Sequence, residues 1–189
     1  MLARVSWEDL EYWCFHGLAL MSLRNNAYAT VASRANILTH SAAPKPYLIR
    51  LSTFQQQPLL GDYRQGQLCL NDCGLIVADE WVRSAANRKG VDLDVWTITP
   101  TSLQSIVFLQ APATVGVGLT GIHEGQKPWL LSSFIASFKA VAAKRINLRL
   151  NQLGQSVWQR NYNEHLIGDD DYLAELRYKL QSQNHQPTV

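Results

Sequence analysis

The sequence lacks the features that would place it in several common classes. It has 17 lysines and arginines against 15 acidic residues, and the net charge of +2 gives no basic field over the whole molecule. With three cysteines it has no disulfide framework, and it shows neither a signal-peptide pattern nor an apolar run long enough to span a bilayer. We therefore expect a cytoplasmic protein without a membrane interaction, and any nucleic-acid site must be local.

What is present fits one globular domain with extra terminal sequence. The 189 residues are 47% hydrophobic and 17% charged, which is ordinary for a folded protein. Apolar residues recur at helical spacing near the amino terminus, and Pro44-Lys45-Pro46 then interrupts the chain. We interpret residues 1–43 as an appended helical segment, 44–183 as the main domain and 184–189 as a tail.

Within the main domain, turn residues separate short strands from helices. Asn71 or Asp72 can cap a helix that ends before Gly90, and Ser132 or Ser133 can cap the strongest helix of the chain. The acidic run 169–171 starts a last helix that continues through Leu180. The predicted strands are Tyr47–Phe54, Leu59–Tyr63, Gln67–Leu70, Val91–Thr99 and Ser105–Leu109, and 157–167 is expected to be extended.

The order of these elements predicts the fold class. Strand, hairpin, helix, paired strands, helix, strand and helix is an α+β order with mostly antiparallel pairing. In Val91–Thr99, apolar residues alternate with Asp92 and Asp94, which is typical of a half-buried strand. We expect a ferredoxin-like antiparallel sheet with helices packed on one face.

Two groups of motifs resemble one protein family. The first group is QLCLNDCGLIVADEW at 67–81 with VDLDVW at 91–96. The second is SFIASFKA at 133–140, KRIN at 144–147 and VWQRNYNEHLI at 157–167. In their order and spacing, over roughly residues 46–183, these motifs resemble the REP-associated single-tyrosine (HUH) transposases, which are DNA-handling proteins of mobile elements.

The resemblance implies a specific chemistry. In that family two histidines on the sheet and a polar side chain of the last helix hold a divalent metal, and a tyrosine on that helix attacks DNA. A metal offsets the charge by which a phosphodiester repels nucleophiles. The tyrosine forms a covalent intermediate that conserves bond energy for rejoining.

This chain departs from the family at the residues that carry the chemistry. The two histidine positions correspond to Ser102 and Gln104, and the third ligand position corresponds to Gln183. Serine is a poor metal ligand and glutamine a modest one. The family tyrosine falls on Lys179, with Tyr178 one position earlier, so Tyr178 is a displaced candidate nucleophile. We expect no metal cofactor, and Mg²⁺ or Mn²⁺ only if activity is retained.

Recognition of DNA does not need the metal. Basic residues of the long helix could contact phosphates, and residues of the extended segment combine stacking surface with hydrogen-bond donors. The alternative is that the basic residues form a solvated helix face and that Trp158 belongs to the core. The candidate DNA-binding residues are Lys139, Lys144, Arg145, Arg149, Trp158, Gln159, Arg160 and Asn161.

Three functions remain open from the sequence. The first is a degenerate transposase-like protein that binds hairpin or single-stranded DNA without nuclease activity. The second is an active transposase or nickase that uses Tyr178. The third is a protein-interaction module in which residues 1–43 cover the former DNA face. The sequence does not decide whether the chain forms a homodimer.

Overall fold

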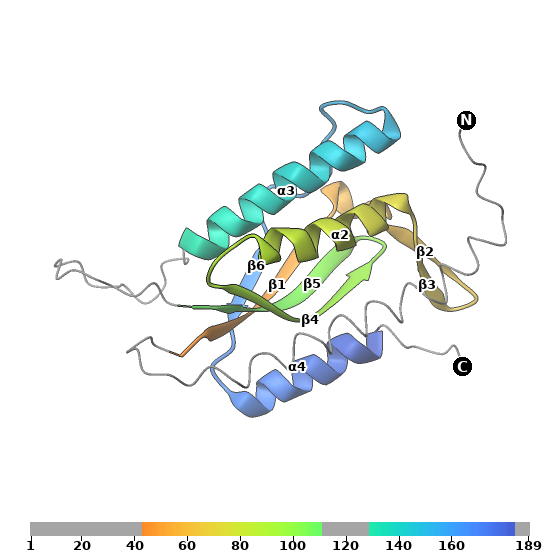
Figure 1. Ribbon diagram of the computed structural model, residues 1–189. Coiled ribbons are helices and arrows are strands. Elements are labelled where there is room, and N and C mark those ends of the chain that lie inside the picture. Colours follow the sequence, from red (N-terminus) through yellow and green to blue (C-terminus); the bar gives the residue numbers. More distant parts are fainter. Residues whose placement is uncertain (1–42, 111–128, 184–189) are drawn as a thin grey trace.

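The computed structural model describes residues 43–110 and 129–183, and its centre is a four-stranded sheet (Figure 1). The strands lie in the order β4-β5-β1-β6, and every neighbouring pair is antiparallel. Helix α2 precedes β4 and helix α3 precedes β6, which gives the strand-helix-strand-strand-helix-strand order of a ferredoxin-like fold. The bounds are β1 Lys45–Ser52, α2 Asp72–Ala86, β4 Val91–Thr99, β5 Ser102–Leu109, α3 Trp129–Leu150 and β6 Asn163–Leu166.

The predicted α+β class and the antiparallel sheet are confirmed, and the helices divide between the two faces. Helices α2 and α3 cover one face, whereas α4 (Asp170–Gln183) lies against the other (Figure 1). Leu173, Leu176 and Leu180 of α4 form a separate apolar cluster with sheet residues that include Ile106. The expectation of helices on one face therefore holds for α2 and α3, and differs for α4 because the sheet presents apolar side chains on both faces.

The larger core lies between the sheet and the pair α2 and α3. Trp81 of α2 is fully buried, with its ring centroid 5.1 Å from that of Phe134 and 4.8 Å from that of Phe138. Ile49 and Leu51 of β1 belong to the same cluster. Burial of these large side chains away from water is the main favourable contribution to this half of the fold.

Local signals at the start of α2 are confirmed. The side chain of Asn71 accepts hydrogen bonds from the backbone N–H groups of Cys73 and Gly74, as a helix N-cap does. Gly74 is required there because a Cβ would collide with the backbone carbonyl oxygen of Leu60. Before this helix, β2 (Gly61–Arg64) and β3 (Gln67–Leu70) form the predicted hairpin, and Gln65 and Gly66 both have positive φ.

Other predicted boundaries shift by a few residues. Strand β5 begins at Ser102 rather than Ser105, because Ser102 pairs with both Thr99 and Ser52. This pairing extends the strand over polar residues that the sequence pattern does not mark as a strand. Helix α3 begins at Trp129, before the serines expected to cap it. Within the segment 157–167, only Asn163–Leu166 is a strand, and Trp158 forms an isolated bridge with Thr53. Elsewhere, a short 3₁₀ helix spans Phe54–Gln56.

Helices cover both faces of the sheet, and a β-bulge changes which of these faces the side chains point to along β4. Its pairing with β5 shifts between Leu93 and Trp96, so the alternation predicted from the sequence does not continue along the strand. Trp96 and Ile98 pack in the α2 and α3 core, whereas Val95 packs with α4. The prediction of a half-buried strand is thus wrong for the second half of β4.

The expected appended helix at 1–43 lies almost wholly outside the described residues, as does the tail. None of the described helices has the length and apolar character needed to cross a membrane.

Candidate functional site

The two positions that correspond to the family's histidines lie on the α4 face of the central strand β5. Ile106 of β5 pairs with Leu48 of β1, and both pack in the α4 cluster. Side chains two residues apart on a strand point to the same face. The side chains of Gln104 and Ser102 therefore point to the same face as Ile106, next to the apolar residues that α4 covers.

Polar residues of the neighbouring strands surround these two positions. Gln104 pairs with Arg50 of β1 and with Thr97 of β4, and Arg50 pairs in turn with Asn163 of β6. This row crosses all four strands. Because residues paired across strands share a face, the four side chains project from the α4 face of the sheet.

A second, shorter row lies next to the first. Ser102 pairs with Ser52 of β1 and with Thr99 of β4, and the Thr99 and Ser102 hydroxyl oxygens are 2.9 Å apart. We call these seven residues the polar strip, and it consists of Ser52, Thr99, Ser102, Arg50, Thr97, Gln104 and Asn163.

Helix α4 directs one polar side chain along the same stripe as its buried leucines. Gln183 comes seven residues after Leu176 and three after Leu180, which keeps it on the sheet-facing side. Its Oε1 atom is buried and has no hydrogen-bond partner among the residues described. In the resembled family this position carries the third metal ligand.

Tyr178 lies on the outer side of α4. One residue turns a helix by about 100°, so Tyr178 is about 200° from both Leu176 and Leu180. Its side chain is 74% exposed. Lys179 is also exposed, but it lies closer to the leucine stripe, on the same side of α4 as Tyr172. The Tyr172 ring stands edge-on to the ring of His165 in β6. A nucleophile acting on a phosphate at the polar strip would have to point toward the sheet, and Tyr178 does not.

The residues at the family's metal position do not fit a divalent metal. Ser102 and Gln104 are neutral oxygen donors, and Arg50, which is the strand-pairing partner of Gln104, adds a positive charge to the same face, which disfavours a cation. Within 43–110 and 129–183, no group of three or more His, Cys, Asp or Glu side chains is arranged to hold a metal.

Among the candidate DNA-binding residues, Lys139 is engaged inside the fold. Its ammonium group donates to the backbone carbonyl oxygens of Gln159 and Arg160, the latter at 3.0 Å. Burial lowers the pKa of Lys139. These bonds tie the segment after α3 to the helix.

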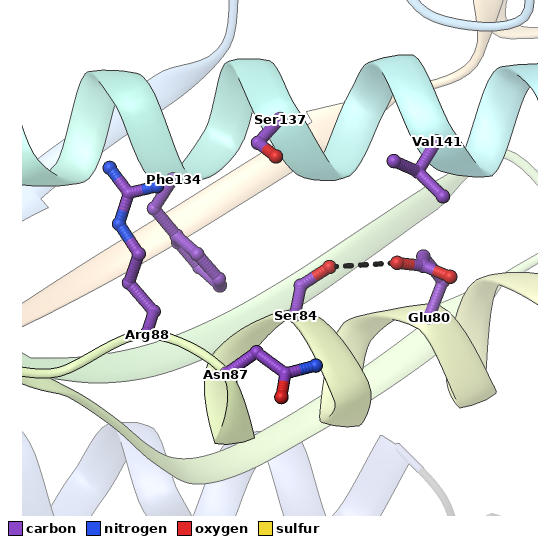
Figure 2. Close-up of a pocket in the computed structure, with 7 residues that line it drawn as sticks. All are labelled: Glu80, Ser84, Asn87, Arg88, Phe134, Ser137 and Val141. Atoms are coloured by element: carbon purple, nitrogen blue, oxygen red, sulfur yellow. Dashed lines mark hydrogen bonds between the residues drawn. The ribbon is translucent and has the colours of Figure 1, made fainter.

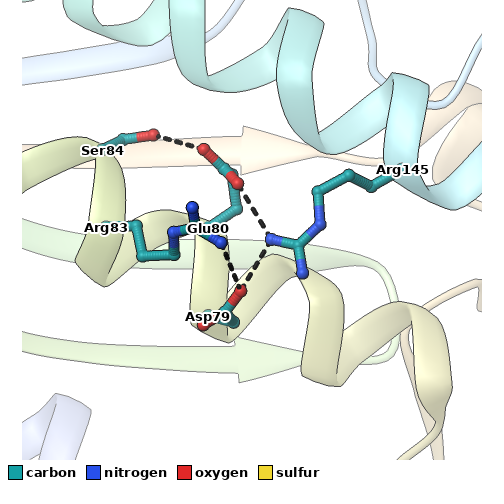
Figure 3. A network of polar contacts seen from close by, with 5 residues as sticks. All are labelled: Asp79, Glu80, Arg83, Ser84 and Arg145. Atoms are coloured by element: carbon teal, nitrogen blue, oxygen red, sulfur yellow. Dashed lines mark hydrogen bonds and ion pairs between the residues drawn. The ribbon is translucent and has the colours of Figure 1, made fainter.

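Arg145 is the centre of an ion-pair network between α3 and α2. Its guanidinium lies 2.7 Å from a carboxylate oxygen of Asp79 and 2.9 Å from one of Glu80, and Figure 3 shows the arrangement of these side chains. The hydrogen bond to Asp79 is the main cause that raises the pKa of Arg145. Glu80 is 8% exposed and also accepts a hydrogen bond from Ser84. Arg145 thus neutralises a buried carboxylate.

The remaining basic residues of α3 are at the surface. Arg149 forms an ion pair with Asp72 at the start of α2, and both side chains are more than half exposed. Lys144 is exposed. These two residues, unlike Lys139 and Arg145, could exchange their present surroundings for a phosphate at little cost.

The segment after α3 divides between core and surface. Trp158 is 7% exposed and packs on Phe138 with ring centroids 5.7 Å apart, so it belongs to the core. Gln159 is half-buried, and its backbone N–H donates to Ser52. Arg160 and Asn161 are exposed. Of this predicted set, Arg160 and Asn161 are the residues that solvent reaches freely.

A pocket between α2 and α3 has a volume of about 190 Å³ and lies away from the polar strip (Figure 2). Its charged groups already have partners, since Arg88 donates to Ser133 and Glu80 accepts from Arg145 and Ser84. The lining residues are Glu80, Ser84, Asn87, Arg88, Phe134, Ser137 and Val141.

Sequence reasoning missed Arg50. It stands in a strand of ordinary composition, and only its pairing with Gln104 brings it to the metal position. An expected pairing of the first strand with the strand after Pro100 could have indicated it, because that pairing fixes which residues share a face.

Comparisons with known proteins give similarity at the level of the fold. No protein-family model matches the chain, and no curated protein matches it in sequence. A candidate transposase from Deinococcus radiodurans has a similar structure, with a TM-score of 0.46 and 13% identity over 80% of this chain and 100% of that one. A REP-associated tyrosine transposase bound to a REP hairpin gives a TM-score of 0.47 and 12% identity over 77% and 70% of the two chains.

Proposed function

We propose that the chain is a transposase-like protein, related to the REP-associated tyrosine transposases, that binds hairpin or single-stranded DNA and does not cut it. The proposal rests on this chain's own motifs over roughly residues 46–183 and on one structural observation. The positions that resemble the family's metal site lie together on the central strand, yet they carry Ser102 and Gln104 beside Arg50.

The loss of cutting follows from the chemistry of the phosphodiester. Attack on its phosphorus needs a Lewis acid to offset the negative charge, and neutral hydroxyl and amide oxygens next to a guanidinium do not assemble one. The side chain of Tyr178 is 74% exposed on the outer side of α4. Both parts of the strand-transfer reaction are thus missing from their expected places.

DNA binding requires neither the metal nor the nucleophile that DNA cutting needs. Exposed cations neutralise phosphates and release counterions, and this process depends on the number of contacts rather than on a metal. Lys144 and Arg149 on α3, together with Arg160 and Asn161 after it, form the exposed part of the predicted DNA-binding set. We assign them to the candidate contact surface.

Fluorescence anisotropy with three labelled DNAs tests the proposal. A hairpin with a single-stranded flank, an unstructured single strand and a duplex are titrated at low salt, with and without Mg²⁺ or Mn²⁺. We expect the hairpin and the single strand to bind more tightly than the duplex, affinity to fall as salt rises, and the metal to have no specific effect.

Denaturing gels of the same mixtures separate the competing functions. A covalent protein–DNA adduct that forms with metal and disappears in Tyr178→Phe would identify an active strand-transfer enzyme and refute the proposal. Failure of all three DNAs to bind at low salt, together with a stable oligomer, would instead support a protein-interaction module.

A further inference from the structure

The polar strip is unusual because its charge is entirely positive. Arg50 is its single charged member, and Gln104 and Asn163 beside it carry amide groups. Thr97 and Ser102 are each only 1% exposed, and the Ser102 hydroxyl is bonded to that of Thr99. Arg50 is exposed, and its side chain has no hydrogen bond or ion pair with another described residue. The next acidic side chain on this face, Asp94, is held by Arg177 of α4 at 2.6 Å. Such a surface suits an anion.

The strip also has the donors that a phosphate requires. A guanidinium presents a planar fork of N–H groups that matches two phosphate oxygens. Gln104, paired with Arg50, supplies an amide N–H₂, and Asn163 on the other side of Arg50 supplies another. Gln104 is half-buried and Asn163 is exposed, so donors flank Arg50 on both neighbouring strands.

Helix α4 limits the strip at one end. The apolar rows of the same face are covered by Leu173, Leu176 and Leu180, and Gln183 continues this stripe beyond them. The buried Oε1 of Gln183 has no partner within the described part of the chain, although its amide group can both donate and accept. An unsatisfied buried polar atom is costly, and a ligand or water at this end of α4 would satisfy it.

We propose that Arg50 binds a backbone phosphate of DNA at this strip, so that a fixed guanidinium replaces the divalent metal that the resemblance places there. This inference rests on the proposed DNA-binding function and adds a phosphate contact on the face of the sheet opposite to α3. A guanidinium neutralises the phosphate and orients it through two hydrogen bonds, but it provides no metal-bound site for a leaving oxygen. Binding is therefore retained without cutting.

The test compares Arg50 with the basic surface of α3. Arg50→Gln removes the charge and keeps a polar side chain of similar length, and Arg50→Lys restores a charge without the fork. The comparison is the double variant Lys144→Gln with Arg149→Gln, which removes two charges of the candidate contact surface on the opposite side of the sheet. Each protein is titrated against the labelled hairpin and single strand over a series of salt concentrations.

We expect Arg50→Gln to weaken binding about tenfold or more and to reduce the slope of log affinity against log salt by about 0.7 on the single strand, the amount expected for one lost phosphate contact. Arg50→Lys should recover part of the affinity, because it keeps the charge but loses the bidentate geometry. The α3 double variant should retain more affinity than Arg50→Gln. Unfolding in urea should be the same for Arg50→Gln and the wild type, since Arg50 is exposed.

The outcomes separate the two proposals. If the wild type binds DNA and Arg50→Gln binds it equally well, the inference is overturned and DNA binding stands. The same holds if the α3 double variant loses the larger share of the affinity. If the wild type binds no DNA, both proposals fail.

Two further measurements identify the ligand. In an NMR titration of wild-type protein with the hairpin, the side-chain signals of Arg50 and Gln104 should shift together, which does not depend on any variant folding. Inorganic phosphate should compete only weakly, because it lacks the remaining DNA contacts. Competition at the concentration at which the hairpin itself saturates the protein would point to free phosphate and overturn the assignment to DNA, as would a tightly held Mn²⁺ at the strip.

Discussion

The two faces of the sheet differ in how they are stabilised. The α2 and α3 face is covered by two helices with fully buried aromatic rings, and its charged residues are paired across the helices. The α4 face is covered by one helix with three leucines and leaves a polar strip beside it. Because a small apolar cluster stabilises less than a large one, the α4 face contributes less to the stability of the fold.

The basic residues also differ in how they are held on the two faces. The cations predicted to meet DNA lie on α3, where Lys139 and Arg145 serve the fold itself. Arg50 lies beside Gln104 on the α4 face and is unpaired among the described residues. A basic residue in a sequence is thus a candidate phosphate ligand only once its acidic neighbours in space are known.

The core substitutions should give the largest difference between the faces. Phe138→Ala removes a fully buried ring that packs on both Trp81 and Trp158, and we expect a loss of about 3–5 kcal/mol in the free energy of unfolding. Leu176→Ala on the α4 side should cost about 2–3 kcal/mol, at the low end for its class because the cluster is smaller.

Urea unfolding followed by circular dichroism measures both variants. Tyr63→Ala serves as a control for a large exposed side chain, because the residue is 61% exposed and its loss should be close to neutral. Equal losses in Phe138→Ala and Leu176→Ala would show that the two faces contribute alike and would remove the basis of the comparison.

Removal of an ion pair should also cost more unfolding free energy on the α2 and α3 face than on the α4 face, but the difference should be smaller than for the core substitutions. Arg145→Ala leaves the buried carboxylate of Glu80 without its partner, and we expect a loss of about 1–3 kcal/mol. Arg177→Ala breaks the pair with Asp94 on the α4 side. Since the side chain of Arg177 is 41% exposed, its loss should cost about 1 kcal/mol or less.

Arg83→Ala is the matched control for Arg145→Ala. Arg83 also approaches Asp79, at 3.8 Å, but its side chain is 65% exposed, so the loss should be near zero. A destabilisation in Arg83→Ala as large as that in Arg145→Ala would mean that burial of Glu80 is not what makes Arg145 important.

The smallest effect concerns alkaline pH. Burial raises the pKa of Tyr162, which packs on the α2 and α3 side, from 10.0 to about 12. Between these two values the unfolded chain releases the proton and the folded chain keeps it, so this tyrosine makes stability fall as pH rises through the window. Tyr162→Phe should reduce that fall.

The difference between urea midpoints at about pH 9 and about pH 11 isolates this effect, because any loss of packing in Tyr162→Phe is the same at both values. If the midpoint of the variant falls as steeply as that of the wild type, the titration of Tyr162 does not contribute to alkaline unfolding.

The sequence by itself determined the local features and the fold class. The cap at Asn71 or Asp72, the hairpin before it and the strand Val91–Thr99 were predicted from patterns of neighbouring residues, and the structure contains all three. The side chains of Ser102 and Gln104 are also known from the sequence alone, since they keep their donor chemistry in any fold.

Only the tertiary structure decided what surrounds those residues. Strand pairing places Arg50 beside Gln104, and the bulge in β4 turns Val95 toward α4. The packing of α3 on α2 brings Arg145 into an ion pair with Glu80. Each of these depends on contacts between residues far apart in the chain. Local propensity and periodicity do not encode such contacts, because a shift of one residue in pairing moves a side chain to the opposite face.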